Sequence, residues 1–260
     1  MNINLPSIII AILTVLLINC TVTASEDTID TSKLSVVMRN AELPERLIKK
    51  INKALEENPA FIADMLTCLS GEKYLRELVD KQHSLPKDYV PDDLVTLEEG
   101  GYQLVRKGSL RRVAAESLGK MSAAARADGI VLVISSTYRP YDYQVTVYNR
   151  NVQVLGKKEA DRESARPGFS QHQTGLVVDF YPVTDLLAKT RAGRWLATNA
   201  SRFGWSISYP SGYEAVTGYK WENWHYRYVG IDLARFIDNY FEGVQQYALR
   251  FLHEWELAKP

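Results

Sequence analysis

The segment SQHQTGLVVDF, residues 170–180, places a histidine and a carboxylate beside a short apolar run. Leu176–Phe180 has the length and composition of a buried strand, yet Asp179 lies inside it. A buried charge without a partner is costly, so either Asp179 has a strong partner or this is not an ordinary core strand. Gly175 would allow a turn between His172 and the strand.

The elements around this segment have recognisable boundaries. Residues 109–129 carry apolar side chains at helical spacing, with Ser109 as the expected N-cap and Gly129 after the last turn. The β-branched run IVLVISSTY, residues 130–138, follows at once and predicts a strand. WSISYP, residues 205–210, predicts another short strand.

Three further helices are predicted towards the C-terminus. Residues 142–156 form the first, a segment ending at Gly204 includes the second, and a single long helix is expected over about 231–258. Helices alternating with short strands and glycine loops indicate an α+β fold, in which helices flank a mainly antiparallel central sheet.

The N-terminal part of the chain has a different organisation. Residues 25 to about 42 are polar and are expected to be loosely ordered, whereas residues 44–80 predict two helices with a break at Asn58-Pro59. The proline-containing segment that follows predicts an extended linker. We therefore expect a helical N-terminal extension over residues 25–80 and a main domain over residues 81–260.

The first residues are typical of an export signal. Residues 7–18, SIIIAILTVLLI, form an apolar stretch that is short for a transmembrane helix. Val22 and Ala24 permit cleavage after Ala24, which would make residues 1–24 a signal peptide. A second interpretation is a lipoprotein signal with a lipidated Cys20, and a third is an uncleaved anchor. Each predicts an exported protein, periplasmic or associated with the cell envelope, and the last two would anchor it to the membrane.

The composition is ordinary for a globular protein. Thirty-one basic and 31 acidic side chains leave no net charge, which gives no electrostatic basis for binding nucleic acid. Only Cys20 and Cys68 are present, so cleavage after Ala24 would leave no intramolecular disulfide, and Cys68 is expected to be a buried helix residue. Aromatic residues cluster at 138–148 and 205–228, as they often do in grooves for polar ligands.

Two of the four histidines lie in local patterns that contain carboxylates, SQHQTGLVVD and ENWH. Catalytic zinc commonly takes three protein ligands from His, Asp or Glu and leaves one position for water. His172, Asp179 and His225 could supply these ligands in a cleft on the sheet, and the metal would neutralise Asp179. Glu222 would then be free to accept a proton from the activated water. Taken alone, either histidine can also be an ordinary hydrogen-bonding residue.

Arg139 directly follows the predicted strand, between Tyr138 and Pro140. At the end of a strand its guanidinium would face a cleft, where it could bind a substrate carboxylate through two hydrogen bonds. The alternative is an arginine stacked on surface tyrosines.

Four segments in order resemble the successive motifs of the VanY-type D-alanyl-D-alanine carboxypeptidases: SSTYRPYDYQ, ARPGFSQHQTGLVVDF, WLATNASRFGWSISYP and TGYKWENWHYRYVG. The resemblance covers about residues 80–240. It implies a zinc peptidase with the metal-site fold shared by lysostaphin-type endopeptidases and the hedgehog signalling domain.

The resemblance also implies roles for individual residues. His172, Asp179 and His225 match the ligands of one Zn²⁺, and Glu222 matches the catalytic base. Arg139 matches the arginine that contacts the substrate's terminal carboxylate and the developing oxyanion.

Three further positions, Gln144, Ser170 and Tyr209, match residues that help to hold the terminal D-alanine in related L,D-carboxypeptidases. Two positions depart from the family pattern, because many relatives have Glu in place of Gln171 and Arg in place of Ser208. Neither departure replaces a ligand or the base, so we expect it to affect the shape of the substrate groove.

The resemblance implies a zinc-dependent carboxypeptidase that removes the C-terminal D-alanine from peptidoglycan stem peptides, and the N-terminal signal adds the expectation that it is exported. Nothing in the motifs separates this D,D-activity from L,D-carboxypeptidase activity on tetrapeptide stems. A third interpretation is a non-catalytic module that binds the cell wall. Loss of the base would be the simplest sign of such a module, and Glu222 is present.

Overall fold

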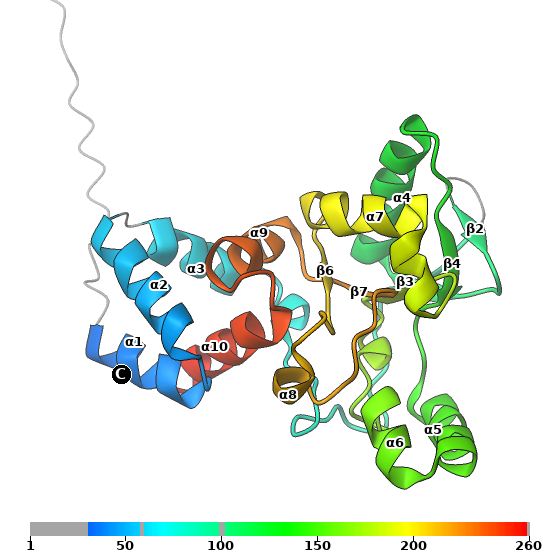
Figure 1. Ribbon diagram of the computed structural model, residues 1–260, viewed down its shortest axis with the longest axis horizontal. Coiled ribbons are helices and arrows are strands. Elements are labelled where there is room, and N and C mark those ends of the chain that lie inside the picture. The colour runs from blue at the N-terminus through cyan, green and yellow to red at the C-terminus, as the bar shows by residue number, and fades with distance from the viewer. Residues whose placement is uncertain (1–30, 58–59, 99–101, 259–260) are drawn as a thin grey trace, which may run out of the picture.

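The computed structural model describes residues 31–57, 60–98 and 102–258, and these residues form two packing units (Figure 1). The helical unit consists of α1 (Thr31–Asn40), α2 (Glu45–Glu57), α3 (Ala60–Ser70), α9 (Ile231–Tyr240) and α10 (Gln245–Leu257). The sheet unit contains α4 (Arg112–Ala127), α5 (Tyr141–Leu155), α6 (Lys157–Glu163) and α7 (Arg191–Asn199), whereas Val216 of the short α8 (Glu214–Thr217) packs against the helical unit.

Seven short strands form the sheets among the described residues: β1 (Leu94–Thr96), β2 (Gln103–Leu104), β3 (Ser109–Arg111), β4 (Val133–Ser136), β5 (Val177–Phe180), β6 (Trp205–Ile207) and β7 (His225–Tyr228). The central sheet has the order β2-β4-β5-β7-β6, and β1 pairs separately with β3. All neighbours in the central sheet are antiparallel except β2 and β4. The prediction of an α+β fold with a mainly antiparallel sheet is confirmed.

The apolar run in β5 is continuous because both faces of this central strand are buried. Val178 and Phe180 belong to the core beneath α4 and α7, and burying each such side chain contributes about 1.5–3 kcal/mol. Val177 and Asp179 project from the opposite face because side chains alternate along a strand. Asp179 is therefore placed on the second face of the sheet.

A separate hydrophobic core holds the helical unit together. It joins α1–α3 with α9 and α10, and Phe61 lies at its centre with its ring against Phe236, Tyr240 and Phe251. Cys68 is buried in α3, as predicted, and burial raises the pKa of its thiol to about 12. This core joins elements from both ends of the described chain. The domain boundary expected near residue 80 stays a prediction.

The prediction of a loosely ordered segment at residues 25–42 is wrong for its described part. Thr31–Asn40 forms α1, which packs against α10. Leu34, Val37 and Met38 lie one helical turn apart and are buried in the helical core. Three apolar residues in a polar sequence were enough to hold this helix, because a distant element covers them.

The predicted long C-terminal helix is divided in two. α9 ends at Tyr240 and α10 begins at Gln245, with Phe241 and Val244 both buried in the helical core. Glu242 and Gly243 have positive φ angles of 56° and 73°, which an α-helix cannot contain. This turn allows the two helices to cover the same core.

Smaller corrections concern the ends of other elements. Ser109 is not an N-cap. It lies in β3, where it pairs with Thr96 of β1, and the helix begins only at Arg112. Gly129 follows the helix with a φ of 69°, as expected. The second predicted helix of residues 44–80 ends at Ser70, and a short 3-10 turn, η1 (Lys73–Arg76), follows it.

A buried carboxylate, Asp80, ties the linker to the helical unit. Its Oδ1 accepts hydrogen bonds from the backbone N–H of Gln82 at 2.9 Å and of His83 at 3.0 Å, and it lies 2.8 Å from His83 Nδ1. Its Oδ2 accepts a hydrogen bond from Gln246 Nε2 in α10 at 2.6 Å. The segment leading into the sheet unit is thus held against the C-terminal helix.

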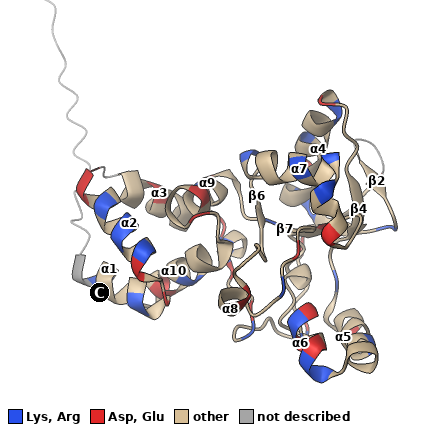
Figure 2. Cartoon of the chain, viewed as in Figure 1, with Lys and Arg blue, Asp and Glu red and all other residues tan. Residues whose placement is uncertain are grey.

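The predicted signal peptide or lipoprotein signal lies outside the described residues. Within the described part of the chain, no helix has both the length and the apolar character needed to cross a membrane. Basic and acidic side chains are interspersed on the helices, as α2 and α6 illustrate (Figure 2).

Candidate metal centre and active site

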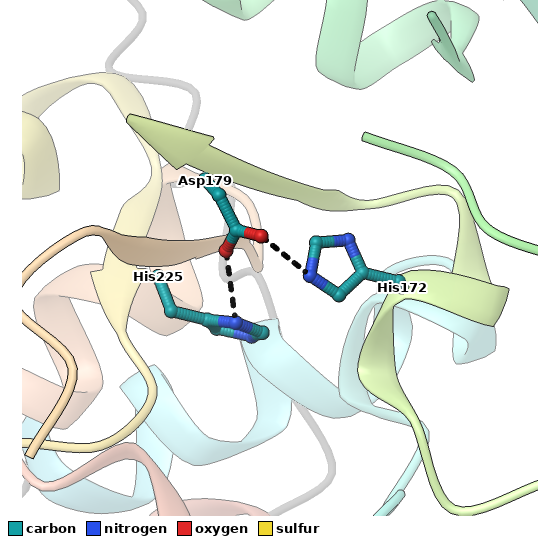
Figure 3. Close-up of side chains that lie close together, drawn as sticks. All are labelled: His172, Asp179 and His225. Atoms are coloured by element: carbon teal, nitrogen blue, oxygen red, sulfur yellow. Dashed lines mark ion pairs between the residues drawn. The ribbon is translucent and has the colours of Figure 1, made fainter. Parts of the chain in front are cut away.

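Three predicted ligands meet on the second face of the sheet. Asp179 in β5 is the register partner of His225 in β7. His172 comes from the 3-10 turn η2 (Gln171–Thr174) that precedes β5. Each residue offers one atom to a group whose members all lie within 4.8 Å of one another, and the two carboxylate oxygens of Asp179 point one to each ring (Figure 3).

Gly175 makes the turn between η2 and β5. Its φ is 71°, a left-handed conformation that most other residues avoid. A Cβ at this position would lie 3.0 Å from Leu94 Cδ2 and 3.2 Å from Pro91 Cγ. The expected turn is therefore present, and it allows the side chain of His172 to lie beside that of Asp179 in the following strand.

The hydrogen bond at its other ring nitrogen fixes the tautomer of His172. Nδ1 lies 2.7 Å from the carbonyl oxygen of Thr137, and a carbonyl can only accept, so Nδ1 carries the proton. The lone pair is then on Nε2, 3.1 Å from Asp179 Oδ2. Burial lowers the pKa of His172 to about 4, which keeps the ring neutral at physiological pH.

The same reasoning applies to His225. Its Nε2 lies 3.3 Å from the amide oxygen of Gln171, so this nitrogen carries the proton. Nδ1 carries the lone pair whenever the ring is neutral, and it faces Asp179 Oδ1 at 3.2 Å and Glu222 Oε2 at 3.4 Å.

These groups fit a metal ion. One ring nitrogen of each histidine points at the carboxylate of Asp179, and no hydrogen-bond donor reaches the buried Asp179 Oδ1 among the described residues. Zinc bonds of about 2.0 Å in a tetrahedral arrangement would separate the ligand atoms by roughly 3.3 Å; here His172 Nε2 lies 3.1 Å from Asp179 Oδ2 and His225 Nδ1 lies 3.2 Å from Oδ1. Burial opposes ionisation of Asp179, and a bound cation would offset that cost.

Glu222 lies beside the three ligands without being one of the group. Its backbone N–H donates to the carbonyl of Tyr209 at 3.0 Å, and its carboxylate reaches towards His225. Burial, reinforced by the charge of Asp179, raises the pKa of Glu222 well above its ordinary value. A raised pKa makes a carboxylate a better proton acceptor at neutral pH.

Arg139 enters the site from the end of β4, where the sequence placed it. It donates from Nη1 to Gln144 Oε1 at 2.8 Å and from Nη2 to Ser136 Oγ at 3.1 Å, and Nη2 lies 3.8 Å from Asp179 Oδ2. Its Nε is buried without a hydrogen-bond partner among the described residues. The alternative of an arginine stacked on surface tyrosines is wrong.

The remaining predicted residues line the same cleft of about 900 Å³. Gln144, on α5, is 1% exposed and donates to the carbonyl of Ala165 at 2.6 Å, while Ser170 precedes η2. Tyr209 lies between two rings, 4.8 Å from that of His225 and 4.7 Å from that of Tyr219. All eight predicted site residues therefore border one cleft.

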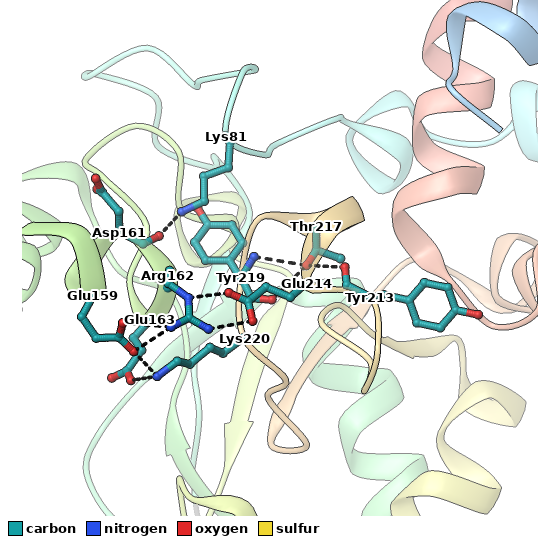
Figure 4. Close-up of polar contacts among 10 residues, drawn as sticks. All are labelled: Lys81, Glu159, Asp161, Arg162, Glu163, Tyr213, Glu214, Thr217, Tyr219 and Lys220. Carbon is teal, nitrogen blue, oxygen red and sulfur yellow. Dashed lines mark hydrogen bonds and ion pairs between the residues drawn. The ribbon is translucent and has the colours of Figure 1, made fainter. Parts of the chain in front are cut away.

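An ion-pair network joins α6, α8 and Lys220 (Figure 4), and its residues Arg162, Glu163 and Lys220 line the cleft. Arg162 of α6 donates to Glu214 of α8 at 2.5 and 2.9 Å and to Glu159 at 2.9 Å. Lys220 pairs with Glu159 and, at 2.6 Å, with Glu163. These contacts join α6 to the segment that leads to Glu222.

The comparisons with known proteins address the same residues. The sequence model of the VanY D-alanyl-D-alanine carboxypeptidases matches residues 107–231. The putative carboxypeptidase YodJ of Bacillus subtilis (strain 168) is 34% identical over 198 residues, which cover 70% of this chain and 72% of YodJ. The chain belongs to the VanY family.

Solved structures agree with this assignment. The LdcB LD-carboxypeptidase has a TM-score of 0.58 and 36% identity, over 64% of this chain and 85% of LdcB. A mutant of the vancomycin-resistance D,D-pentapeptidase VanY, solved with Zn(II), has a TM-score of 0.54 and 32% identity, over 66% of this chain and 96% of that one. The VanY-family protein described here is thus a metallo-carboxypeptidase with zinc as its cofactor.

Sequence reasoning missed the residues that orient the ligands. The carbonyl of Thr137 and the amide of Gln171 each accept a hydrogen bond from one histidine ring, and Tyr219 packs against Tyr209 in the lining of the cleft. Gln171 and Ser208, the two departures from the family pattern, contact each other at 2.7 Å. A pair of departures at fixed positions was the signal that could have indicated this contact.

Proposed function

We propose that this protein is a zinc-dependent carboxypeptidase that removes the C-terminal D-alanine from peptidoglycan stem peptides. The proposal rests on one observation: two histidines and one carboxylate converge beside a carboxylate of raised pKa and an arginine whose side chain is 13% exposed. Membership of the VanY family gives the reaction class, and the D-alanine substrate is the proposed part.

In this proposal His172 Nε2, Asp179 and His225 Nδ1 hold the zinc ion. When bound, zinc acts as a Lewis acid towards the scissile carbonyl and makes water more acidic. The described chain supplies the remaining groups. The carbonyl of Thr137 and the amide of Gln171 hold the two rings with their other nitrogens towards Asp179.

Glu222 is the proposed proton carrier. Its carboxylate accepts a proton from the attacking water and passes it to the amine of the departing D-alanine, so that one group acts as base and then as acid. Because burial raises the pKa of Glu222 above its ordinary value, the carboxylate is basic enough to accept the proton of the attacking water.

Arg139 is the proposed anion-binding group. The guanidinium projects into the cleft with Gln144 and Ser136 behind it, which fixes its plane. From there it can donate to the terminal carboxylate of the peptide and to the oxygen of the scissile carbonyl as negative charge develops. Gln144, Ser170 and Tyr209 would border the terminal D-alanine.

A second candidate is L,D-carboxypeptidase activity on tetrapeptide stems, favoured by the likeness to LdcB, which has the higher identity of the two solved structures described above. The two activities differ in the configuration of the residue that precedes the scissile bond.

Purified tetrapeptide and pentapeptide stems separate the candidates. Each stem is incubated with the zinc-loaded protein and the products are weighed by mass spectrometry. Loss of one alanine from the pentapeptide alone supports D,D-activity, and loss from the tetrapeptide alone supports L,D-activity. If neither the tetrapeptide nor the pentapeptide is cleaved, the proposed function is contradicted. Because the substrate lies in the cell wall, we also propose an exported location, which cell fractionation tests.

A further inference from the structure

Gln171 lies behind His225, on the side away from the proposed metal. Its side chain is buried, and the residue is 2% exposed. The amide oxygen lies 3.3 Å from His225 Nε2 and 2.7 Å from the hydroxyl of Ser208. At the other end of the amide, Nε2 donates to the carbonyl of Val79 at 3.5 Å. Since a carbonyl cannot donate, this last contact determines which end of the amide is nitrogen.

We propose that Gln171 is a positioning residue that fixes the tautomer of His225 and thereby sets the affinity of the site for its metal. The inference rests on the proposed metal site. With the amide oxygen against Nε2, His225 must carry its proton there, and Nδ1 offers its lone pair to the ion. Histidine ligands are commonly held through their second ring nitrogen in this way, and the loss of such a partner lowers metal affinity by about 10–100-fold.

Ser208 holds the two partners together. Its backbone N–H donates to the carbonyl of His225 at 3.2 Å, while its hydroxyl donates to Gln171. The serine therefore fixes the backbone of the ligand and the amide oxygen that its ring meets. The amide oxygen of Gln245, the first residue of α10, lies 3.4 Å from the same hydroxyl. The hydrogen-bonded series from His225 through Gln171 and Ser208 therefore extends into the helical unit.

The acceptor is a neutral amide, which distinguishes it from a carboxylate in its electronic effect. A hydrogen bond to a charged acceptor is about twice as strong as one between neutral groups and makes the imidazole a stronger ligand. The neutral Gln171 thus orients His225 without adding a second negative charge beside Asp179. The Gln171→Glu variant should therefore bind zinc at least as tightly as the wild-type protein does.

The test compares three variants of the full chain. Gln171→Met removes the acceptor at similar volume, and Gln171→Glu keeps it. Gln173→Met is the matched control, because Gln173 is a buried glutamine on the same turn that donates instead to the carbonyl of Pro86 at 2.9 Å. Zinc dissociation constants come from competition with a chromogenic chelator, and the visible spectrum of the Co²⁺-substituted proteins reports the ligand field.

We expect zinc binding to weaken about 10–100-fold in Gln171→Met only, and the Co²⁺ spectrum of that variant to differ from that of the wild type. Wild-type affinity and spectrum in Gln171→Met would overturn the inference, as would equal weakening in Gln173→Met. If Gln171→Met does not fold, ¹⁵N NMR of the metal-free wild type decides: the proton of His225 should be on Nε2, and a proton on Nδ1 would overturn the inference. A wild type that binds no zinc would contradict the proposed function itself.

Discussion

Asp179 and His225 face each other as register partners in the β5–β7 ladder. Side chains opposite each other in an antiparallel pair leave the same face of the sheet with Cβ atoms about 4.5–5.5 Å apart, so the backbone alone brings these two groups together. Only His172 has to be delivered from outside the ladder, and the turn at Gly175 does so. Two strands and one turn are sufficient to build the centre.

Replacing Glu222 by Gln should separate binding from catalysis. The amide keeps the size of the side chain but cannot accept the proton, so kcat should fall by about 10²–10⁴-fold, while zinc content stays at the wild-type level. Steady-state kinetics and metal analysis of the purified variant check both statements. A variant with the wild-type kcat would remove Glu222 from the role of base.

Removing the metal should abolish turnover and lower stability. Without a cation, the lone pairs of His172 and His225 face the carboxylate of Asp179 with no positive charge between them. Zinc at 100 times its dissociation constant should stabilise the fold by about 2.7 kcal/mol. Activity and melting temperature after chelation, and again after zinc is restored, provide the measurement. Full activity in a chelated, metal-free sample would contradict the zinc mechanism.

Arg139→Met should impair the recognition of a free C-terminal carboxylate. Loss of the guanidinium removes a donor to the carboxylate and to the developing oxyanion, so kcat/KM should fall by about 10²–10³-fold. Arg150→Met, an exposed change on α5, is the control. A substrate whose C-terminus is amidated should lose far less activity in the variant than the free acid does. Equal losses for the two substrates would show that Arg139 does not bind the carboxylate.

Arg162→Met should loosen the wall of the cleft. The change removes the hydrogen bonds that join α6 to Glu214 of α8, together with one to Glu159 within α6. Faster amide hydrogen exchange is expected in α6 and α8, together with a raised KM, whereas exchange in the central sheet should not change. Unaltered exchange in α6 would mean that its packing against α5 is sufficient to hold it.

Asp80→Asn should destabilise the protein in a pH-dependent way. Burial opposes ionisation of Asp80, but its hydrogen bonds from Gln82 and His83 outweigh this and lower its pKa. A lowered pKa in the folded state stabilises the fold above the unfolded pKa of about 3.9, and this contribution is lost as the pH falls through the folded value.

At pH 7 the loss should be about 1–3 kcal/mol, and the difference from wild type should shrink below pH 4. Urea unfolding at pH 7 and pH 3 measures both, with the exposed Asp88→Asn as control. A difference between variant and wild type that did not change with pH would show that the charge of Asp80 contributes nothing.

The sequence predicted much of the site because its residues lie in short local patterns. His172 and Asp179 share one turn and strand, and Glu222 and His225 lie three residues apart. The contacts that orient them could not be predicted in this way. Gln171 and His225 are 54 positions apart, and nothing in the local sequence of either indicates the other.

The fold shows the same division. The alternation of apolar runs and glycine turns predicted the sheet, since strand and helix periods are local properties. α1 was missed because its apolar face has meaning only once α10 lies against it. The break at Glu242 and Gly243 was missed for a related reason: the turn serves a core that the sequence around it does not reveal.

The shared core of the helical unit sets an order on folding during synthesis. α1–α3 expose the residues that will form this core until α9 and α10, some 160 residues later in the chain, have left the ribosome. Contacts of such sequence separation form slowly, and exposed apolar surface in the interval invites association with other chains. The nascent protein should therefore depend on a holding chaperone until α10 is made.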